Sequence, residues 1–367
     1  MSLSPVELRH QMHQIPELMF QEYETTKLIL ANLEKIPNIK IHHPIETGLL
    51  VEYYNNDKDY LLFRADIDAL PIKEETGAAF ASQNNCMHAC GHDIHSSILY
   101  GFINYIVTEK IGKNILFLFQ PAEEGGGGAK KIIETGVLNQ FKISKAYALH
   151  VTDEYPAGAI ASTPGILFAS SLEVNIKFKG KSAHVAFPYE GINAFNALRL
   201  FLDAVDKIPK NIEEPTLIGV GKISAGTVRN IVPSSAELEG TIRALTSEKA
   251  LGYYDNLIQI LEGIKKSTGA DFEIEKGAHY NQVHVSPELY DKYLKVLSPK
   301  FKIIDCGYKM TGEDFGFFTD LYPSFMFWLG TYNGKKFGLH HPKFLPDDSV
   351  IDLGIESYKL ILNSELS

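Results

Sequence analysis

Three apolar runs of strand length, at residues 60–64, 114–119 and 146–150, stand out in the first half of the chain. Short runs of this kind, without polar alternation, are typical of strands that are buried on both faces of a sheet. Residues 5–35 and 93–108 read as helical segments that lie among these strands. This order predicts an α/β domain in which helices flank a mixed sheet.

A different pattern begins near residue 172. Residues 172–179 alternate between apolar and polar side chains, as expected for a strand with one solvated face. The elements that follow are a helix over 192–208, strands over 216–223 and 236–243, a helix over 248–266 and a strand over 271–276. Their β-α-β-β-α-β order is that of a ferredoxin-like α+β domain.

The chain resumes its α/β character after about residue 282, so the ferredoxin-like domain is predicted to be an insertion. We expect residues 1–171 and 282–367 to form one discontinuous catalytic, metal-binding domain. Residues 172–281 are expected to form a separate lid and dimerisation domain. A chain of 367 residues is long enough for two domains of ordinary size.

Polar side chains recur where the apolar strands end. Asp66 and Asp68 follow the first run, Glu123 and Glu124 follow the second, and His150 ends the third. Ligands of open α/β sheets bind at the carboxyl ends of the strands. The sequence therefore predicts a functional site at this edge of the sheet.

Residues 88–95, His-Ala-Cys-Gly-His-Asp-Ile-His, add the strongest chemical signal. Cys90 and His92, as thiolate and neutral imidazole, suit zinc, cobalt, nickel or manganese. A structural zinc site is the weaker alternative, because no second C-x-x-C or H-x-H element completes a tetrahedral set. Asp93 and His95 either add to the site or cap the helix that follows.

The neighbouring acids Glu123 and Glu124 suggest two separate roles. On an extended chain their side chains point apart, so one can bind metal while the other exchanges protons. The alternative is a solvated acidic turn. Residues 125–128 are four glycines that lack the spacing of a phosphate loop, so we expect them to allow close backbone packing.

Three residues of the inserted domain are further candidates. His184 follows its first strand, although a lone histidine is more often structural, and no serine nucleophile motif surrounds it. Arg243 offers a guanidinium fork for a substrate carboxylate, and Asn230 lies in the same domain. An isolated arginine is, however, more often a surface residue.

Composition narrows the class of partner. The net charge of −10 argues against nucleic acid, and no apolar run reaches the length of a membrane span. The N-terminus carries no signal-peptide core, and three cysteines make no disulfide framework, which together favour the reducing cytoplasm.

These motifs resemble the amidohydrolase branch of the aminoacylase/carboxypeptidase metallopeptidases. The resemblance rests on residues 64–71, 87–93, 119–125, 240–243 and 312–315, and it extends from about Leu8 to the C-terminus. Within that branch, residues 325–330 and 338–341 are most similar to the N-acetyldiaminopimelate deacetylases.

The resemblance implies a site for two divalent metal ions, of zinc, manganese, cobalt or nickel. It implies that Cys90 bridges both ions, that His92 and His150 complete one site, and that Glu124 and His340 complete the other. His340 is preferred to its neighbour His341 because it follows the Gly-Leu pair that precedes the ligand in the family.

The same resemblance assigns the remaining roles. Glu123 would be the general base, and Asp68 would orient groups behind the ligands. Asp66 occupies a position that other branches fill with a metal-binding histidine, so its catalytic part stays open. Family members often form dimers through the inserted domain, and His184 would then stabilise the oxyanion in the partner's site.

The implied reaction is removal of the acetyl group from N-acetyl-L,L-diaminopimelate, which yields acetate and L,L-diaminopimelate for lysine and cell-wall synthesis. A general N-acyl-amino-acid or hippurate-type hydrolase is one alternative. A metal-binding sensor without activity is another, but the intact pair Glu123 and Glu124 weighs against it.

Overall fold

The computed structural model describes residues 2–209 and 211–366, and they divide into two compact units. Unit 1 comprises residues 1–167, 283–308 and 314–367, and unit 2 comprises residues 168–282 and 309–313. None of the helices in the described residues is long and apolar enough to cross a membrane.

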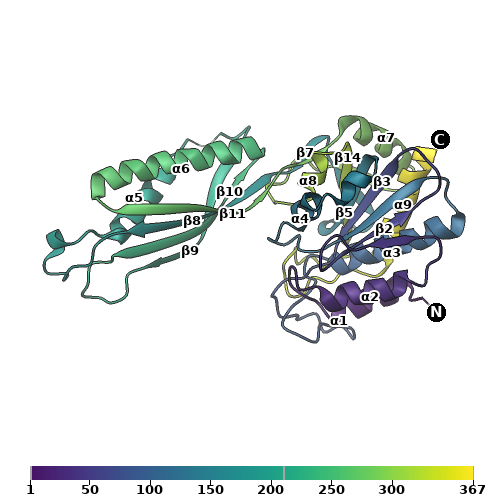
Figure 1. The fold of residues 1–367 in the computed structure, drawn as a ribbon, viewed down its shortest axis with the longest axis horizontal. Helices are drawn as coiled ribbons and strands as arrows, with labels where there is room; N and C mark the ends of the chain where they lie inside the picture. The colour runs from purple at the N-terminus through teal and green to yellow at the C-terminus, as the bar shows by residue number, and fades with distance from the viewer. Residues whose placement is uncertain (1, 210, 367) are drawn as a thin grey trace. The chain divides into compact units, whose positions relative to one another are not determined.

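Unit 1 is built on an eight-stranded mixed sheet (Figure 1). In spatial order its strands are β1 (Lys40–His42), β2 (Leu49–Tyr53), β4 (Asn114–Gln120), β3 (Tyr60–Asp66), β5 (Ile143–Pro156), β14 (Ser324–Tyr332), β6 (Ala159–Ser162) and β13 (Lys302–Asp305). The central strands β4, β3, β5 and β14 run parallel. Every residue of β4 is buried, as its unbroken apolar run predicts.

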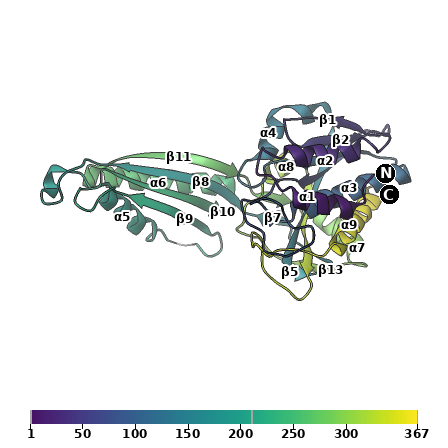
Figure 2. The same ribbon diagram turned by 90° about the horizontal axis from the view of Figure 1, so that it is seen from below.

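The helices of unit 1 are α1 (Pro5–Gln14), α2 (Tyr23–Leu33), α3 (His92–Glu109), α4 (Gly128–Glu134), α7 (Pro287–Leu297), α8 (Gly316–Thr319) and α9 (Ser349–Leu366). Helix α3 packs against α1, α9 and strand β3 (Figure 2). A capping box fixes the start of α1, where Ser4 accepts the amide of Glu7 and the Glu7 carboxylate accepts the amide of Ser4. A short sheet pairs β7 (Gly165–Phe168) with β12 (Val283–Val285).

Unit 2 has the predicted β-α-β-β-α-β order. Its elements are β8 (Ser170–Lys179), α5 (Ala194–Val205), β9 (Thr216–Ala225), β10 (Ser235–Ala244), α6 (Ser247–Thr268) and β11 (Asp271–Tyr280). The strands form an antiparallel sheet in the order β11-β8-β10-β9, and α5 and α6 pack against it. Buried and exposed residues alternate along β8, so one face carries the core. The predicted α/β fold class is confirmed.

Candidate metal centre

A tight turn presents Cys90 and His92 at the start of α3. Gly91 between them has a φ of +86°, and a Cβ there would lie 2.4 Å from Cγ2 of Val151. Only glycine combines this left-handed backbone with so close an approach. The turn therefore lets the thiol of Cys90 and the ring of His92 lie beside strand β5, which carries His150.

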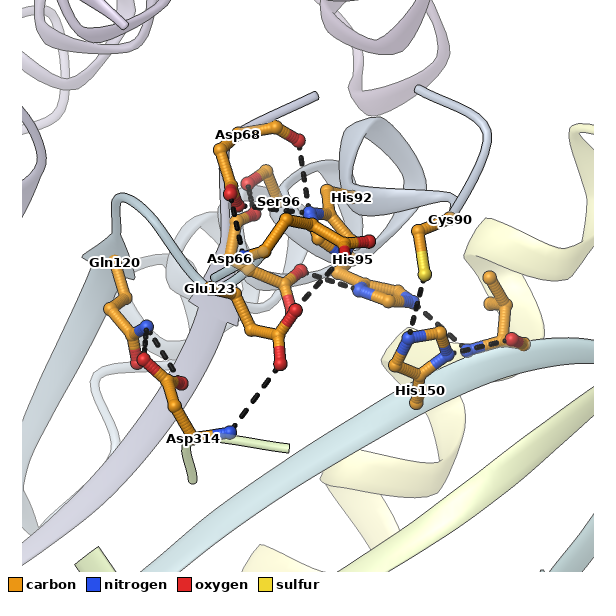
Figure 3. Close-up of polar contacts among 12 residues, drawn as sticks. Asp66, Asp68, Cys90, His92, His95, Ser96, Gln120, Glu123, His150 and Asp314 are labelled. Atoms are coloured by element: carbon orange, nitrogen blue, oxygen red, sulfur yellow. Dashed lines mark hydrogen bonds and ion pairs between the residues drawn. The ribbon is translucent and has the colours of Figure 1, made fainter. Parts of the chain in front are cut away.

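The backbone and carboxylate contacts of His92 and His150 engage Nδ1 of each ring, so Nε2 is the nitrogen that can bind a metal (Figure 3). Nδ1 of His92 lies 2.9 Å from the Asp68 carbonyl and 3.1 Å from Asp68 Oδ1, both acceptors, so it carries a proton. Nδ1 of His150 donates to the Val151 carbonyl at 2.8 Å. Among the described residues, Nε2 of His92 has no hydrogen-bond partner, although it is buried. Once this nitrogen is deprotonated, its lone pair can bind a metal ion.

Two groups of candidate ligands share Cys90. One group comprises Cys90, His92 and His150, and the other comprises Cys90, Glu124 and His340; within each, the donor atoms lie within 4.8 Å of one another. Nε2 of His150 lies 3.3 Å from Sγ of Cys90, and Nε2 of His340 lies 3.1 Å from Oε1 of Glu124. The donors are sulfur, nitrogen and oxygen, a set that suits borderline transition metals.

The electrostatics of the site favour a bound cation. Burial, together with Glu124, Glu123 and Asp66, raises the pKa of the Cys90 thiol well above its ordinary value. Burial alone would lower the pKa of His92, but Asp66 and Asp68 outweigh it and raise that pKa to about 10. Both shifts report an excess of negative charge, which divalent ions would offset.

Glu123 and Glu124 lie in a turn, so the expectation of an extended chain there is wrong. Ala122 has a φ of +56°, and the Gly125 amide donates to the Glu123 carbonyl at 2.9 Å. The two carboxylates consequently approach each other, and both lie within 4.8 Å of His92. Glu123 is 6% exposed, and its Oε1 accepts the Asp314 amide at 3.4 Å.

Glycines and Glu22 hold this carboxylate turn in place. A Cβ on Gly128 would lie 1.7 Å from the Pro121 carbonyl oxygen, so this glycine serves close backbone packing, as expected, whereas a Cβ on Gly125 would meet open space. The Ala122 amide donates to Glu22 Oε1 at 2.9 Å, and the Glu124 amide donates to Asp68 Oδ2 at 2.9 Å. Asp68 thus links Glu124 to His92.

Asp66 lies behind the candidate ligands, and both of its carboxylate oxygens accept hydrogen bonds. Its Oδ1 accepts Nδ1 of His95 at 2.6 Å, and its Oδ2 accepts NH1 of Arg64 at 2.8 Å. Nε2 of His95 in turn accepts the Val151 amide at 2.9 Å. His95 therefore has no lone pair left for a metal, and it orients the strand that carries His150.

The prediction that Asp93 or His95 caps α3 is wrong. The N-cap of that helix is Gly91, and no side chain accepts its first amides. The carboxylate of buried Asp93 instead accepts Nδ1 of His13 at 2.9 Å and Nε of Arg9 at 3.2 Å. Two charged partners across the interface with α1 hold Asp93 more strongly than a cap would.

Two of the three candidates in unit 2 are exposed, and the third is half-buried. His184 and Asn230 are exposed and close together, since His184 pairs with Ile231 and the Val185 amide donates to the Asn230 carbonyl. The Ala186 amide donates to Nδ1 of His184 at 3.2 Å, so in the neutral ring the proton resides on Nε2. Arg243 is half-buried, and its NH1 would lie 2.9 Å from a Cβ on Gly312.

Sequence reasoning missed Arg64, Gln120 and Asp314 as parts of the site. Arg64 donates to Gln120 at 2.8 Å and to Asp314 at 2.9 Å. The Gln120 amide also donates to Asp314 (Figure 3). All three are buried. Each of them lies in one of the motifs that carry the family resemblance, residues 64–71, 119–125 and 312–315, and these motifs were the available signal.

Residues 62–364 match Peptidase family M20/M25/M40, and the chain belongs to this family. An N-acetyldiaminopimelate deacetylase of Geobacillus sp. (strain WCH70) is 38% identical over 363 residues, which cover 96% of each chain. One of Bacillus cytotoxicus is 40% identical over 359 residues, or 96% of this chain and 95% of the relative. The predicted family resemblance is thereby confirmed.

The YXEP protein of Bacillus subtilis, a dinuclear metal binding peptidase from the M20 family, has a similar structure. The TM-score is 0.83 at 30% sequence identity, over 99% of this chain and 97% of that one. A fold shared over this length agrees with the extended sequence match.

Proposed function

We propose that this protein is a metal-dependent hydrolase that removes the acetyl group from N-acetyl-L,L-diaminopimelate and yields acetate and L,L-diaminopimelate. The observation that carries the proposal is buried Cys90, shared by two groups of candidate ligands beside Glu123. The similarity to N-acetyldiaminopimelate deacetylases over nearly the whole chain supports the choice of substrate.

The residues present fit two divalent ions. Cys90, His92 and His150 would hold one, and Cys90, Glu124 and His340 the other. The buried Nε2 of His92, which has no hydrogen-bond partner among the described residues, supports this assignment. Bound divalent ions supply Lewis acidity, which polarises an amide carbonyl and makes water more acidic.

Glu123 is proposed to act as the general base. It would take a proton from the attacking water and pass it to the nitrogen of the leaving amine. The amide of Asp314 orients its Oε1, and the turn keeps it next to Glu124. Asp66 would support His95 and Arg64 rather than meet the substrate, because both its oxygens already accept hydrogen bonds.

A panel of N-acyl amino acids, assayed with and without a chelator, tests this function. We expect N-acetyl-L,L-diaminopimelate to be hydrolysed fastest, with activity lost on chelation and regained with Zn²⁺, Mn²⁺, Co²⁺ or Ni²⁺. Preference for hippurate or N-acetylmethionine would favour a general amidohydrolase. Ligand binding without turnover in metal-loaded protein would favour a sensor.

We further propose that unit 2 mediates a homodimer and that Nε2–H of His184 stabilises the oxyanion in the partner's site. Arg243 and Asn230 would bind substrate carboxylates. Because Cys90 must stay reduced to bind metal, we place the reaction in the cytoplasm. The exposure of His184 and its proton on Nε2 support a role outside its own unit.

Mixing two inactive variants tests the dimer. His184→Ala and Glu123→Gln chains should form mixed dimers in which one site has both residues intact. Random exchange would restore about a quarter of wild-type sites, by the two-fold symmetry of such dimers. No recovery after confirmed exchange would refute the action of His184 across the dimer.

A further inference from the structure

Asp153 ties the strand of one candidate ligand to the loop of another. It lies on β5, three residues after His150, and is only 5% exposed. Its Oδ2 accepts the amides of Phe337 at 2.6 Å and Gly338 at 2.9 Å. These two amides directly precede the Leu339–His340 pair, so the anchor lies two residues from the candidate ligand.

Side-chain packing restrains the loop that carries His340 only weakly. Residues 332–337 are all exposed, and the side chain of His340 is itself 52% exposed. Packing therefore contributes little to the position of this ring. A carboxylate that accepts two amides supplies short, charge-assisted hydrogen bonds in its place.

The backbone of the loop has left-handed φ angles, and it needs a restraint to keep them. Gly338 has a φ of +86° and His340 a φ of +62°, and the second value is unfavourable for a residue with a side chain. Beyond the anchor, the His340 amide donates to the Ala89 carbonyl at 2.9 Å. Asp153 and Ala89 thus hold the loop from two sides, and this places Nε2 of His340 beside Glu124.

We propose that Asp153 is a positioning residue that preorganises His340, so that its loss weakens one metal-binding group and spares the other. The inference rests on the proposed two-metal function. The affected group comprises Cys90, Glu124 and His340, whereas the group of Cys90, His92 and His150 has its own restraints in Asp68 and Val151. Groups behind metal ligands typically change metal affinity by about 10- to 100-fold.

The test measures metal affinity without substrate. Metal-free wild type, Asp153→Ala and Asp153→Asn are titrated with Zn²⁺ against a chromophoric chelator, and bound metal is counted by elemental analysis. We expect Asp153→Ala to bind one of two ions about 10- to 100-fold more weakly, with the other unchanged. Asp153→Asn should weaken the same ion less than Asp153→Ala does, since an amide oxygen can still accept both amides but lacks the charge of the carboxylate.

Two further variants make the test robust. Glu154→Ala is the matched control, because it removes an exposed neighbouring carboxylate on the same strand and should leave both affinities unchanged. Gly338→Ala disturbs the loop without altering Asp153: a Cβ there would meet open space, but the left-handed φ disfavours alanine. It should weaken the same ion, and it decides the question if Asp153→Ala does not fold.

Each outcome has one meaning. Two ions bound by Asp153→Ala at wild-type affinity would overturn the inference, and so would equal weakening of both ions. A wild type that binds two ions but hydrolyses no N-acyl substrate would refute the proposed function and leave the positioning role intact. A wild type that binds fewer than two ions would refute the two-metal site, and the inference with it.

Discussion

Most candidate polar residues of unit 1 are buried, with His340 as an exposed exception, whereas the candidates of unit 2 are exposed or half-buried. In unit 1, Asp66, His92 and Asp314 are at most 1% exposed, and hydrogen bonds fix their orientation. In unit 2, His184 and Asn230 lie on the surface. Ion pairs of unit 2 such as Lys222–Glu239 are likewise exposed.

This difference distinguishes a preorganised site in unit 1 from surface residues in unit 2 that can only contribute to a site formed elsewhere. A buried polar group destabilises a protein unless it is paired, so a buried network persists when its members satisfy one another or serve a ligand. The groups around Cys90 fit this description by themselves. The exposed residues of unit 2 do not belong to a buried network, so burial does not indicate their roles and experiments must establish them.

The largest expected effect is on catalysis in unit 1. Glu123→Gln should keep both metal ions but reduce kcat by roughly 100- to 10,000-fold, because it removes a general base. Glu124→Gln should instead lower the metal content. Elemental analysis and kcat, measured on the same preparations, distinguish the two. A Glu123→Gln enzyme within about threefold of wild type would show that the base lies elsewhere.

The loss of one carboxylate should lower the free energy of unfolding much more in unit 1 than in unit 2. Asp314→Ala removes one of the two buried carboxylates that pair with Arg64, together with an acceptor of the Gln120 and Ala129 amides, and should lower the free energy of unfolding by about 3–5 kcal/mol. Glu239→Ala in unit 2 removes an exposed partner of Lys222 and should have no measurable effect. Denaturant titration of both variants measures the contrast, and equal losses would contradict it.

The buried charge of His13 predicts a pH dependence in unit 1. Burial alone would lower its pKa, but Asp93 and Glu74 raise it from 6.5 to about 9. Its stabilisation is thus complete below pH 6.5 and lost as the pH rises through 9; the shift corresponds to roughly 3 kcal/mol.

The free energy of unfolding of metal-free wild type and His13→Gln, measured at pH 6 and pH 9.5, checks this. The wild-type advantage should be large at pH 6 and small at pH 9.5. An advantage of the same size at both values would show that packing, rather than charge, stabilises His13.

The fold and the clustering of the candidate ligands Cys90 and His92 were largely predictable because their signals are local. Apolar runs marked β3, β4 and β5, and the spacing of Cys90 and His92 is contained in one turn. Short strands such as β1 and β13 went unpredicted, since runs of three or four residues carry little periodicity.

The supporting residues were not predictable because their contacts are remote in sequence. Arg64 and Asp314 are 250 residues apart, and Glu22 and Ala122 are 100 residues apart. Nothing near Glu22 indicates that it holds a turn of the site. The carboxylate turn itself was missed because Ala122 adopts a left-handed φ that its residue type does not suggest.

Among the candidate site residues, the smallest expected effect is the stability change in His184→Ala. Its ring is exposed, its nearest ring neighbour is Phe187 with centroids 5.9 Å apart, and its side chain accepts one amide from Ala186. Surface substitutions of this kind usually change the free energy of unfolding by no more than about 0.5 kcal/mol. Any large loss of activity in this variant would then reflect chemistry rather than folding. Denaturant titration of this variant and of wild type measures the change. A loss of free energy of unfolding above about 1 kcal/mol would mean that His184 has a structural role, like the buried residues of unit 1.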